Sequence, residues 1–139
     1  MTQRTAITEV MTSEPITVDR TQPISEAYAI LRDAHFHHLV VVEGDEPVGV
    51  LATTDILRLV YDVDGSSDKA LRTYIDHQFT IDDAMTIDLR TLPLSATVHD
   101  AADALSDGSF HSVVVLADNG TVAGIVTTTD LVRHLRDQG

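Results

Sequence analysis

One stretch of this chain occurs twice. The residues Gly-Val-Leu-Ala-Thr-Thr-Asp at 49–55 return as Gly-Ile-Val-Thr-Thr-Thr-Asp at 124–130. Upstream, Phe-His leads into an apolar run at 36–42 and again at 110–116. A long repeat that is present only twice is not a solenoid, which needs three or more short units. The repeat therefore predicts two half-domains that complete each other.

The match reaches the beginning of each copy and keeps an almost constant spacing. Met11 and Met85 lie 74 residues apart, whereas Asp55 and Asp130 lie 75 residues apart. The second copy therefore carries one extra residue, which we place in the turn near Asn119.

The repeat divides the chain into two motifs and a connection. We assign residues 1–62 to the first motif, 63–79 to a connecting segment with a helix, and 80–139 to the second motif. With 139 residues and 43% apolar content, the two motifs are expected to form one compact domain. No apolar run is long enough to span a membrane and no signal sequence is visible, so a cytoplasmic protein is predicted.

Each copy predicts the order strand, helix, strand, strand, helix. The fold class is therefore α/β (α+β), with two pseudo-symmetric motifs packed through their small sheets. Helices are predicted where apolar residues recur at helical spacing, and strands buried on both faces where apolar residues run continuously. The predicted ranges are 16–18, 24–35, 39–42, 48–51 and a helix from Asp55, then 68–76, then 90–92, 98–107, 113–116, 122–126 and a helix from Asp130.

The charge of the chain excludes one class of partner. Asp and Glu total 22 against 9 Lys and Arg, for a net charge of −13, and Lys69 is the only lysine. So negative a chain repels nucleic acid, which is bound by neutralising its phosphates. Aspartate-rich, lysine-poor surfaces are typical of salt-accumulating microbes, so we predict a halophilic source; an ordinary acidic regulatory protein is the alternative.

The repeated residues resemble the CBS domain family. Its signature is a glycine, two aliphatic residues, Ser or Thr, two variable residues, and an aspartate that opens a helix, preceded by a strand like His-Arg-Leu-Pro-Val-Val. Residues 124–130 match this signature, residues 49–55 match it except for Ala52, and residues 36–42 resemble the strand without its proline. The resemblance covers nearly the whole chain. It implies a tandem pair, or Bateman module, that dimerises and binds adenosine-containing ligands in clefts between its motifs.

Asp55 and Asp130 are the strongest candidates for ligand contact. A carboxylate accepts two hydrogen bonds, which suits the adjacent 2′ and 3′ hydroxyls of a ribose. A capping aspartate at a helix start is the structural alternative. Thr127 and Thr129 add hydroxyls beside the N–H groups of a helix start, where a phosphate binds readily, although threonines also cap helices.

The resemblance also implies that residues of one motif contact the ligand held by the aspartate of the other. On this basis, the predicted contacts of the stronger site are Ile16, Phe36, His37, His111, Ile125, Thr127, Thr129 and Asp130. Those of a second, weaker site are Thr54, Asp55, Phe110 and His111. The second site is expected to be weaker because Ala52 supplies no hydroxyl where Thr127 supplies one.

Metal binding and catalysis find little support in the sequence. His35, His37 and His38 are close in the chain, but adjacent side chains on a strand point to opposite faces, so His37 and His38 would not converge on one metal. The chain has no cysteine, no Walker-type loop, no Gly-x-Ser-x-Gly elbow and no His-Glu-x-x-His motif. We therefore predict neither an enzyme nor a resident cofactor, with Mg²⁺ allowed as a companion of a bound nucleotide.

Three functions stay open at this stage. The leading one is a regulatory module that binds AMP, ADP, ATP or S-adenosylmethionine, forms a homodimer, and passes ligand occupancy to an unidentified protein, as in energy sensing. The second is an interaction dimer with vestigial clefts. The third is a sensor of divalent cations. Neither nucleic acid nor a membrane is an expected partner.

Overall fold

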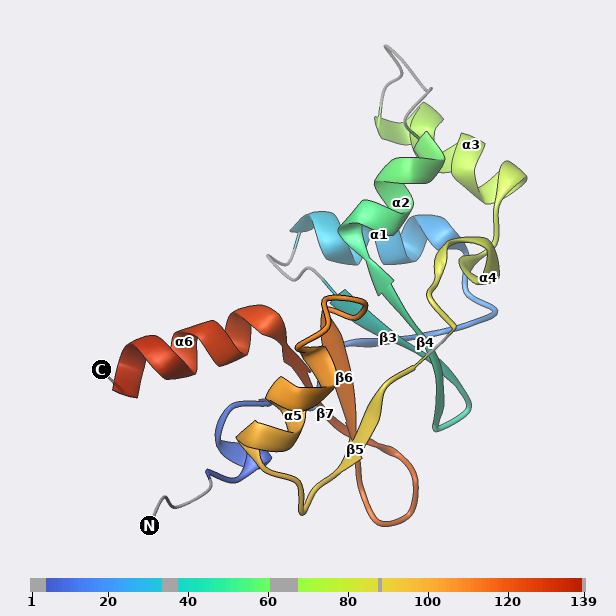
Figure 1. Ribbon diagram of the computed structural model, residues 1–139. Coiled ribbons are helices and arrows are strands. Elements are labelled where there is room, and N and C mark those ends of the chain that lie inside the picture. The colour runs from blue at the N-terminus through green and yellow to red at the C-terminus, as the bar shows by residue number, and fades with distance from the viewer. Residues whose placement is uncertain (1–4, 34–37, 61–67, 88, 139) are drawn as a thin grey trace. The chain divides into compact units, whose positions relative to one another are not determined.

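The sequence repeat returns as two folded units in the computed structural model of the chain (Figure 1). The structure describes residues 5–33, 38–60, 68–87 and 89–138. Unit 1 consists of Met1–Pro15 together with Leu89–Gly139, and unit 2 of Ile16–Asp88. The predicted mixed α+β class is confirmed. The units divide the chain differently from the sequence motifs, because the N-terminal segment folds with the second copy.

Unit 2 contains a three-stranded sheet in the order β2-β3-β4. Strand β2 runs parallel to β3, and β3 runs antiparallel to β4. Helix α1 packs on β3, helix α2 packs on β4, and α3 packs against both helices (Figure 1). The elements are β2 (Thr17–Asp19), α1 (Ile24–Asp33), β3 (His38–Glu43), β4 (Glu46–Ala52), α2 (Thr53–Val60), α3 (Asp68–Gln78) and α4 (Ile81–Ala84).

The core of unit 2 forms between one face of its sheet and the apolar sides of its helices. Alternate residues of a strand share one face, so Leu39 and Val41 of β3 point into the same cluster as Leu51 of β4. Each helix adds an aliphatic side chain to this cluster, including Ile56 from α2 and Ile75 from α3, and all five side chains are buried. The connecting helix is therefore part of the core of unit 2.

Unit 1 contains a four-stranded sheet in the order β1-β7-β6-β5. Strand β5 is parallel to β6, whereas β7 is antiparallel to both β6 and β1. Helix α5 packs on β6 and helix α6 on β7, over a core that includes Ile7, Ala101, Val115 and Val126 (Figure 1). The elements are the 3-10 helix η1 (Ile7–Glu9), β1 (Thr12–Ser13), β5 (Thr91–Pro93), α5 (Val98–Leu105), β6 (Ser112–Leu116), β7 (Val122–Thr127) and α6 (Thr128–Gln138).

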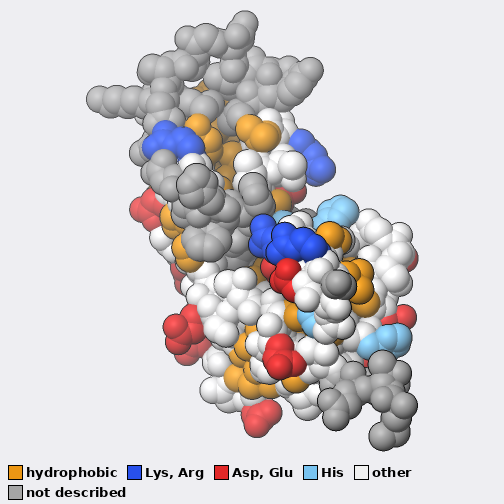
Figure 2. Space-filling view, turned by 90° about the vertical axis from the view of Figure 1, so that its left-hand side faces the viewer, with side chains coloured by type: hydrophobic (Ala, Val, Ile, Leu, Met, Phe, Trp, Pro, Cys, Tyr) orange, Lys and Arg blue, Asp and Glu red, His pale blue; other side chains and the backbone are white. Residues whose placement is uncertain are grey.

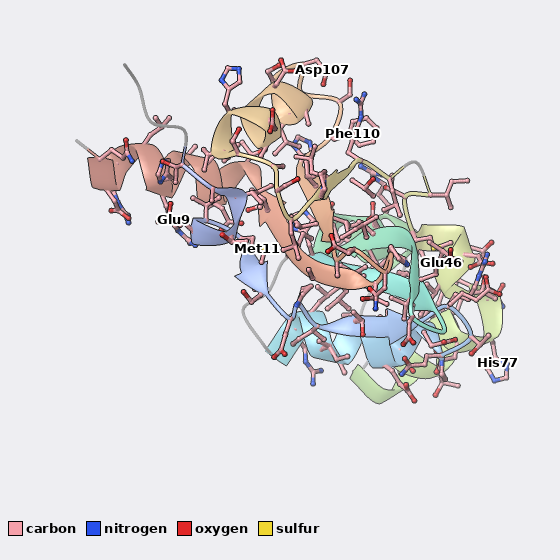
Figure 3. The ribbon with its side chains drawn as sticks, turned by 90° about the horizontal axis from the view of Figure 1, so that it is seen from below. Glu9, Met11, Glu46, His77, Asp107 and Phe110 are labelled. Carbon is pink, nitrogen blue, oxygen red and sulfur yellow. The ribbon has the colours of Figure 1, made fainter. Side chains whose placement is uncertain are left out.

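The methionine at the beginning of each sequence copy packs on the glycine of the other copy. A Cβ atom built at Gly124 would lie 2.6 Å from the Sδ of Met11 and 2.9 Å from the backbone oxygen of Thr12. A Cβ at Gly49 would likewise lie 2.6 Å from the Sδ of Met85. Figure 3 labels Met11, the first of these two methionines. Both glycines are therefore needed for close approach of a neighbouring segment.

The elements predicted from periodicity are present with small shifts at their ends. The apolar runs are strands β3 and β6. Leu39–Val42 and Val113–Val115 are buried as expected, whereas Leu116, the last residue of the second run, is only half-buried. The predicted helix over 24–35 is described as far as Asp33, and the one over 98–107 ends at Leu105 and is followed by a turn in which Gly108 has a positive φ. Strand β1, helix η1 and helix α4 were not predicted, since they are too short to show a period.

The surface is acidic without a dominant acidic patch on the face that Figure 2 presents. There the Asp and Glu side chains lie apart from one another, with apolar side chains exposed between them. Some basic side chains form ion pairs with acidic groups. Arg20 donates to both carboxylate oxygens of Asp82, at 3.3 and 3.0 Å, and to Glu43 at 3.2 Å.

Candidate functional site

The second candidate carboxylate lies in a complete capping box at the beginning of α6. Thr127 precedes the helix, and Asp130 lies three residues on. The Oδ2 of Asp130 accepts the backbone N–H of Thr127 at 2.8 Å and the Thr127 hydroxyl at 3.1 Å. The same hydroxyl accepts the backbone N–H of Asp130 at 3.2 Å. One carboxylate oxygen and the threonine hydroxyl therefore stabilise the helix start.

The other oxygen of Asp130 remains open. Within the described part of the chain, no hydrogen bond or ion pair engages Oδ1. The side chain is half-buried, so its position is held while part of it faces outward. An acceptor held in this way can take hydrogen bonds from the hydroxyls of a ligand.

The first candidate carboxylate has the same backbone bond but a different setting. The Oδ2 of Asp55 accepts the N–H of Ala52 at 2.8 Å, and alanine offers no hydroxyl. Its Oδ1 lies 3.7 Å from Nη1 of Arg58. Because the Asp55 side chain is 12% exposed and that of Arg58 is 79% exposed, the ion pair is well solvated and weak.

A threonine hydroxyl at the beginning of α2 is buried and has no hydrogen-bond partner in the part of the protein that the structure describes. It is the Oγ1 of Thr53, the first residue of the helix, which follows Ala52 directly. Buried hydroxyl groups are nearly always hydrogen-bonded, so an orphaned one calls for a water or a ligand. The corresponding Thr128 of the second copy is exposed. The substitution of alanine for threonine in the repeat gave the only sequence signal for this difference.

Two further candidates, Phe110 and His111, lie beside the start of α6 within unit 1. The carbonyl of His111 accepts the N–H of Thr128 at 3.1 Å, where Ser112 of β6 pairs with Thr127 of β7. His111 is exposed and Phe110 is half-buried. The beginning of β6 and the end of β7 therefore bring these side chains to the same end of the sheet as Asp130.

Phe110 also reveals a residue that sequence reasoning missed. The Cζ of Arg90 lies 4.5 Å from the centroid of the Phe110 ring, in a cation–π contact near the place that Figure 3 labels. Arg90 directly precedes β5. A signal was present in the repeat, because Arg90 occupies the position that Ile16 holds in the first copy.

The remaining candidates are distributed over both units. Ile125 is buried in β7, and Thr129 is exposed in the first turn of α6. In unit 2, Ile16 precedes β2 and its carbonyl accepts the N–H of Val40 at 3.2 Å, while Thr54 is exposed at the start of α2. Phe36 and His37 lie outside the described residues. The grouping of these residues into a stronger and a weaker site stays a prediction.

The structure offers no metal centre in its described ranges. Across residues 5–33, 38–60, 68–87 and 89–138, no group of three or more His, Asp or Glu side chains could hold a metal ion. Within the same ranges, no helix has the length and apolar content needed to cross a membrane.

A family profile described as CBS domain matches residues 7–62 and 81–137. The uncharacterized protein MJ1404 of Methanocaldococcus jannaschii is 27% identical over 144 aligned positions, which cover 96% of this chain and 32% of that protein. The chain thus spans about a third of the length of this relative. An uncharacterized 17.7 kDa protein of Acidianus ambivalens is 25% identical, over 96% of this chain and 74% of its own.

Solved structures share the fold over nearly the full chain. The CBS domain pair of protein MJ0100, in complex with 5′-methylthioadenosine and S-adenosyl-L-methionine, superposes with a TM-score of 0.80 at 25% identity and covers 99% of this chain and 100% of that one. CBSX2 in complex with AMP superposes with a TM-score of 0.75 at 22% identity, covering 96% and 98% of the two chains.

Proposed function

The chain belongs to the CBS domain family, and from that premise we propose that it is a regulatory module that binds adenosine-containing ligands and acts by binding rather than by catalysis. The observation that carries this proposal is the open Oδ1 of Asp130, on a carboxylate whose other oxygen is anchored to the start of α6. The ligands named for the MJ0100 pair contain adenosine, which supports the same ligand class here.

The proposed contact is between this carboxylate and the ribose. Adjacent ribose hydroxyls donate hydrogen bonds to Oδ1, and charge-assisted bonds of this kind are worth about 1.5–3 kcal/mol each. Anchoring Oδ2 fixes the side chain before the ligand arrives, so little conformational entropy is lost on binding. Asp55 is proposed to act in the same way for a second ligand, with Arg58 competing for its Oδ1.

Roles for the other predicted contact residues are proposed from the resemblance to the family. Phe36 and Phe110 are proposed as apolar ligand contacts, and His37 and His111 as donors to phosphate. Mg²⁺ is proposed only as a companion of a phosphate-bearing ligand. Regulation then requires that the ligand bind one conformation better than another, because a ligand with equal affinities shifts no equilibrium. The protein that reads this change is an unidentified partner.

Calorimetry with AMP and S-adenosylmethionine tests the carboxylate directly. The Asp130→Asn variant keeps an oxygen that can accept the Thr127 N–H but loses the charge, and should weaken binding at one site about ten- to hundred-fold. Asp118→Asn is the control, because it removes the same charge from an exposed turn. Asp55→Asn should weaken the other, weaker site. Unchanged affinities in both aspartate variants would reject the carboxylate contact.

We also propose a homodimer. Leu57 on α2 and Val132 on α6 hold equivalent repeat positions, and their side chains are 52% and 59% exposed. Leu135, one turn further along α6, is 71% exposed. Apolar stripes that are left uncovered in the same place on both repeats suit a self-complementary interface. A Val132→Glu variant should sediment as a monomer at micromolar concentration where the wild type sediments as a dimer; a wild type that is itself a monomer would reject the proposal.

The charge supports a further proposal of adaptation to high salt. A net charge of −13 destabilises the compact state by self-repulsion. At 0.1 M salt, the repulsion between charges more than about 10 Å apart is largely screened. The melting temperature should therefore rise from low salt to molar KCl, and a flat profile would count against a halophilic source.

A further inference from the structure

The guanidinium of Arg90 lies over an aromatic ring on the surface of unit 1. Its Cζ lies 4.5 Å from the Phe110 ring centroid, and its side chain is exposed. Its backbone is fixed as well, because the carbonyl of Arg90 accepts the N–H of Val114 in β6 at 2.9 Å. A guanidinium that stacks on a ring keeps its N–H groups in one plane, free at the edge to bind an anion.

Among the described residues, Arg90 has no carboxylate partner, which it shares with Arg133 but not with three other arginines. Arg20 and Arg136 donate to aspartates at 3.0 Å, and Arg58 lies 3.7 Å from Asp55. Among the described residues, no Asp or Glu forms an ion pair or hydrogen bond with Arg90. In a chain with 22 acidic residues, an arginine without an acidic partner has its charge available for an external anion.

The repeat provides an internal comparison. Ile16 has the same place in the first copy, and its carbonyl makes the same bond to the third residue of the neighbouring strand, Val40. The backbone is therefore alike at the two positions, while an aliphatic side chain stands at one and a cation at the other. Packing alone does not need a cation here, since isoleucine is accepted at the equivalent position.

The position of Arg90 joins it to the candidate site. Arg90 precedes β5, His111 precedes β6, and these strands are parallel neighbours. The start of α6 lies at the same end, because Thr128 donates to the His111 carbonyl at 3.1 Å. Arg90 and His111 thus lie at the end of the sheet where α6 begins, with the Arg90 guanidinium over the Phe110 ring.

We propose that Arg90, stacked on Phe110, recognises the phosphate of a bound nucleotide, so that one site prefers phosphorylated adenosine ligands to uncharged ones. The inference rests on the proposed function and deepens it by naming the group that Arg90 reads. A planar guanidinium donates two parallel hydrogen bonds to phosphate oxygens, whereas an uncharged adenosine ligand offers no such acceptor. His111 can add a third donor.

The test compares AMP with adenosine by calorimetry on the full chain. Arg90→Ile places the residue of the first copy in the second, and should weaken AMP about ten-fold or more while adenosine changes less than about two-fold. Arg136→Ile, which removes the same charge at the other end of α6, should leave both affinities unchanged. Arg90→Lys should restore part of the preference for AMP, since it keeps the charge but not the planar fork.

Salt adds a second readout. AMP affinity of the wild type at this site should fall as NaCl rises, and that of Arg90→Ile should fall less. Equal loss of AMP and adenosine in Arg90→Ile, or no change in their ratio, would overturn the role of Arg90 while leaving the proposed function intact. Failure of the wild type to bind either ligand would instead reject the proposed function itself.

Discussion

The two helices that carry the candidate carboxylates begin with the same backbone bond and differ in their hydroxyl groups. Asp130 and Asp55 each accept the N–H of the residue three positions earlier, at 2.8 Å. At α6 the Thr127 hydroxyl completes the capping box, whereas at α2 alanine supplies no hydroxyl, and the buried Thr53 hydroxyl bonds to none of the described protein groups. One helix start is thus satisfied by its own residues, whereas the hydroxyl at the other finds no partner among the described protein groups.

The comparison also reaches what the two units share. In both, a methionine-threonine segment of the other sequence copy lies against the glycine that begins the repeated Gly-to-Asp stretch. Thr12 pairs with Ile125 in unit 1, and Thr86 exchanges two backbone hydrogen bonds with Val50 in unit 2, at 3.0 and 2.8 Å. The two units share the backbone contacts between these segments and their glycines. They differ in side-chain hydroxyls and charges, so the same backbone arrangement carries two chemically different sites.

The largest loss of stability should come from placing a side chain at either of the two glycines that the methionine-threonine segments contact. Gly124→Ala and Gly49→Ala should each lower the free energy of unfolding by about 2–3 kcal/mol, because the new methyl group meets a methionine sulfur at 2.6 Å and a backbone carbonyl at 2.9 to 3.0 Å. Urea denaturation measures both. Adding Met11→Ala should recover part of the loss in Gly124→Ala but none in Gly49→Ala. Rescue in the opposite pairing would show that the segments pack within their own copies.

The next effect tests the buried hydroxyl at α2. Thr53→Val removes a buried hydroxyl that has no partner among the described protein groups, so it should raise the free energy of unfolding by about 1–2 kcal/mol. Thr128→Val is the matched control at the exposed equivalent position, and its stability should change little. Should Thr53→Val destabilise the unliganded protein, the hydroxyl has a partner within the fold and the contrast between the helix starts is wrong.

The order of elements in each repeat could be predicted because it is a local property. The apolar runs of β3 and β6 and the helical spacing of α1 each lie within one segment, and the structure confirms them. The packing of the beginning of each copy on the other copy could not be predicted from the sequence. Thr12 pairs with Ile125, more than a hundred residues away, and a two-residue strand is too short to show a period.

The candidate site was predictable in its residues more than in their contacts. A repeated aspartate at a helix start drew attention to Asp55 and Asp130, yet the reciprocal bonds of Thr127 needed the side-chain geometry. Arg90 was not predicted as a site residue, because a single arginine before a strand forms no recognisable sequence motif. Its contact with Phe110 arises from the parallel pairing of β5 with β6, which joins residues that are far apart in the chain.

A smaller effect should follow from exchanging the caps. Thr127→Ala makes the second helix start resemble the first and should cost about 1 kcal/mol, the usual value of a threonine cap. Ala52→Thr makes the reverse change and should gain a similar amount if the new hydroxyl reaches the backbone N–H of Asp55. Urea midpoints of both variants and of the double variant measure the exchange. A loss in both single variants would mean that the surroundings of α2 do not admit the complete box.

The smallest effect concerns a carboxylate that only unit 2 possesses. The hydroxyl and backbone N–H of Thr21 donate to Asp19 Oδ1 at 2.7 and 3.0 Å and hold the pKa of Asp19 below its ordinary value of 3.8. The equivalent residue in unit 1 is Pro93. A lowered pKa in the folded state contributes stability that is present above the unfolded pKa and is lost as the pH falls through the folded pKa. The difference in melting temperature between wild type and Asp19→Asn should therefore be constant near neutral pH and shrink below about pH 4. Because Thr21 supplies the main stabilisation, Thr21→Val should remove most of that difference; if the difference persists in the Thr21→Val background, another group holds the charge of Asp19.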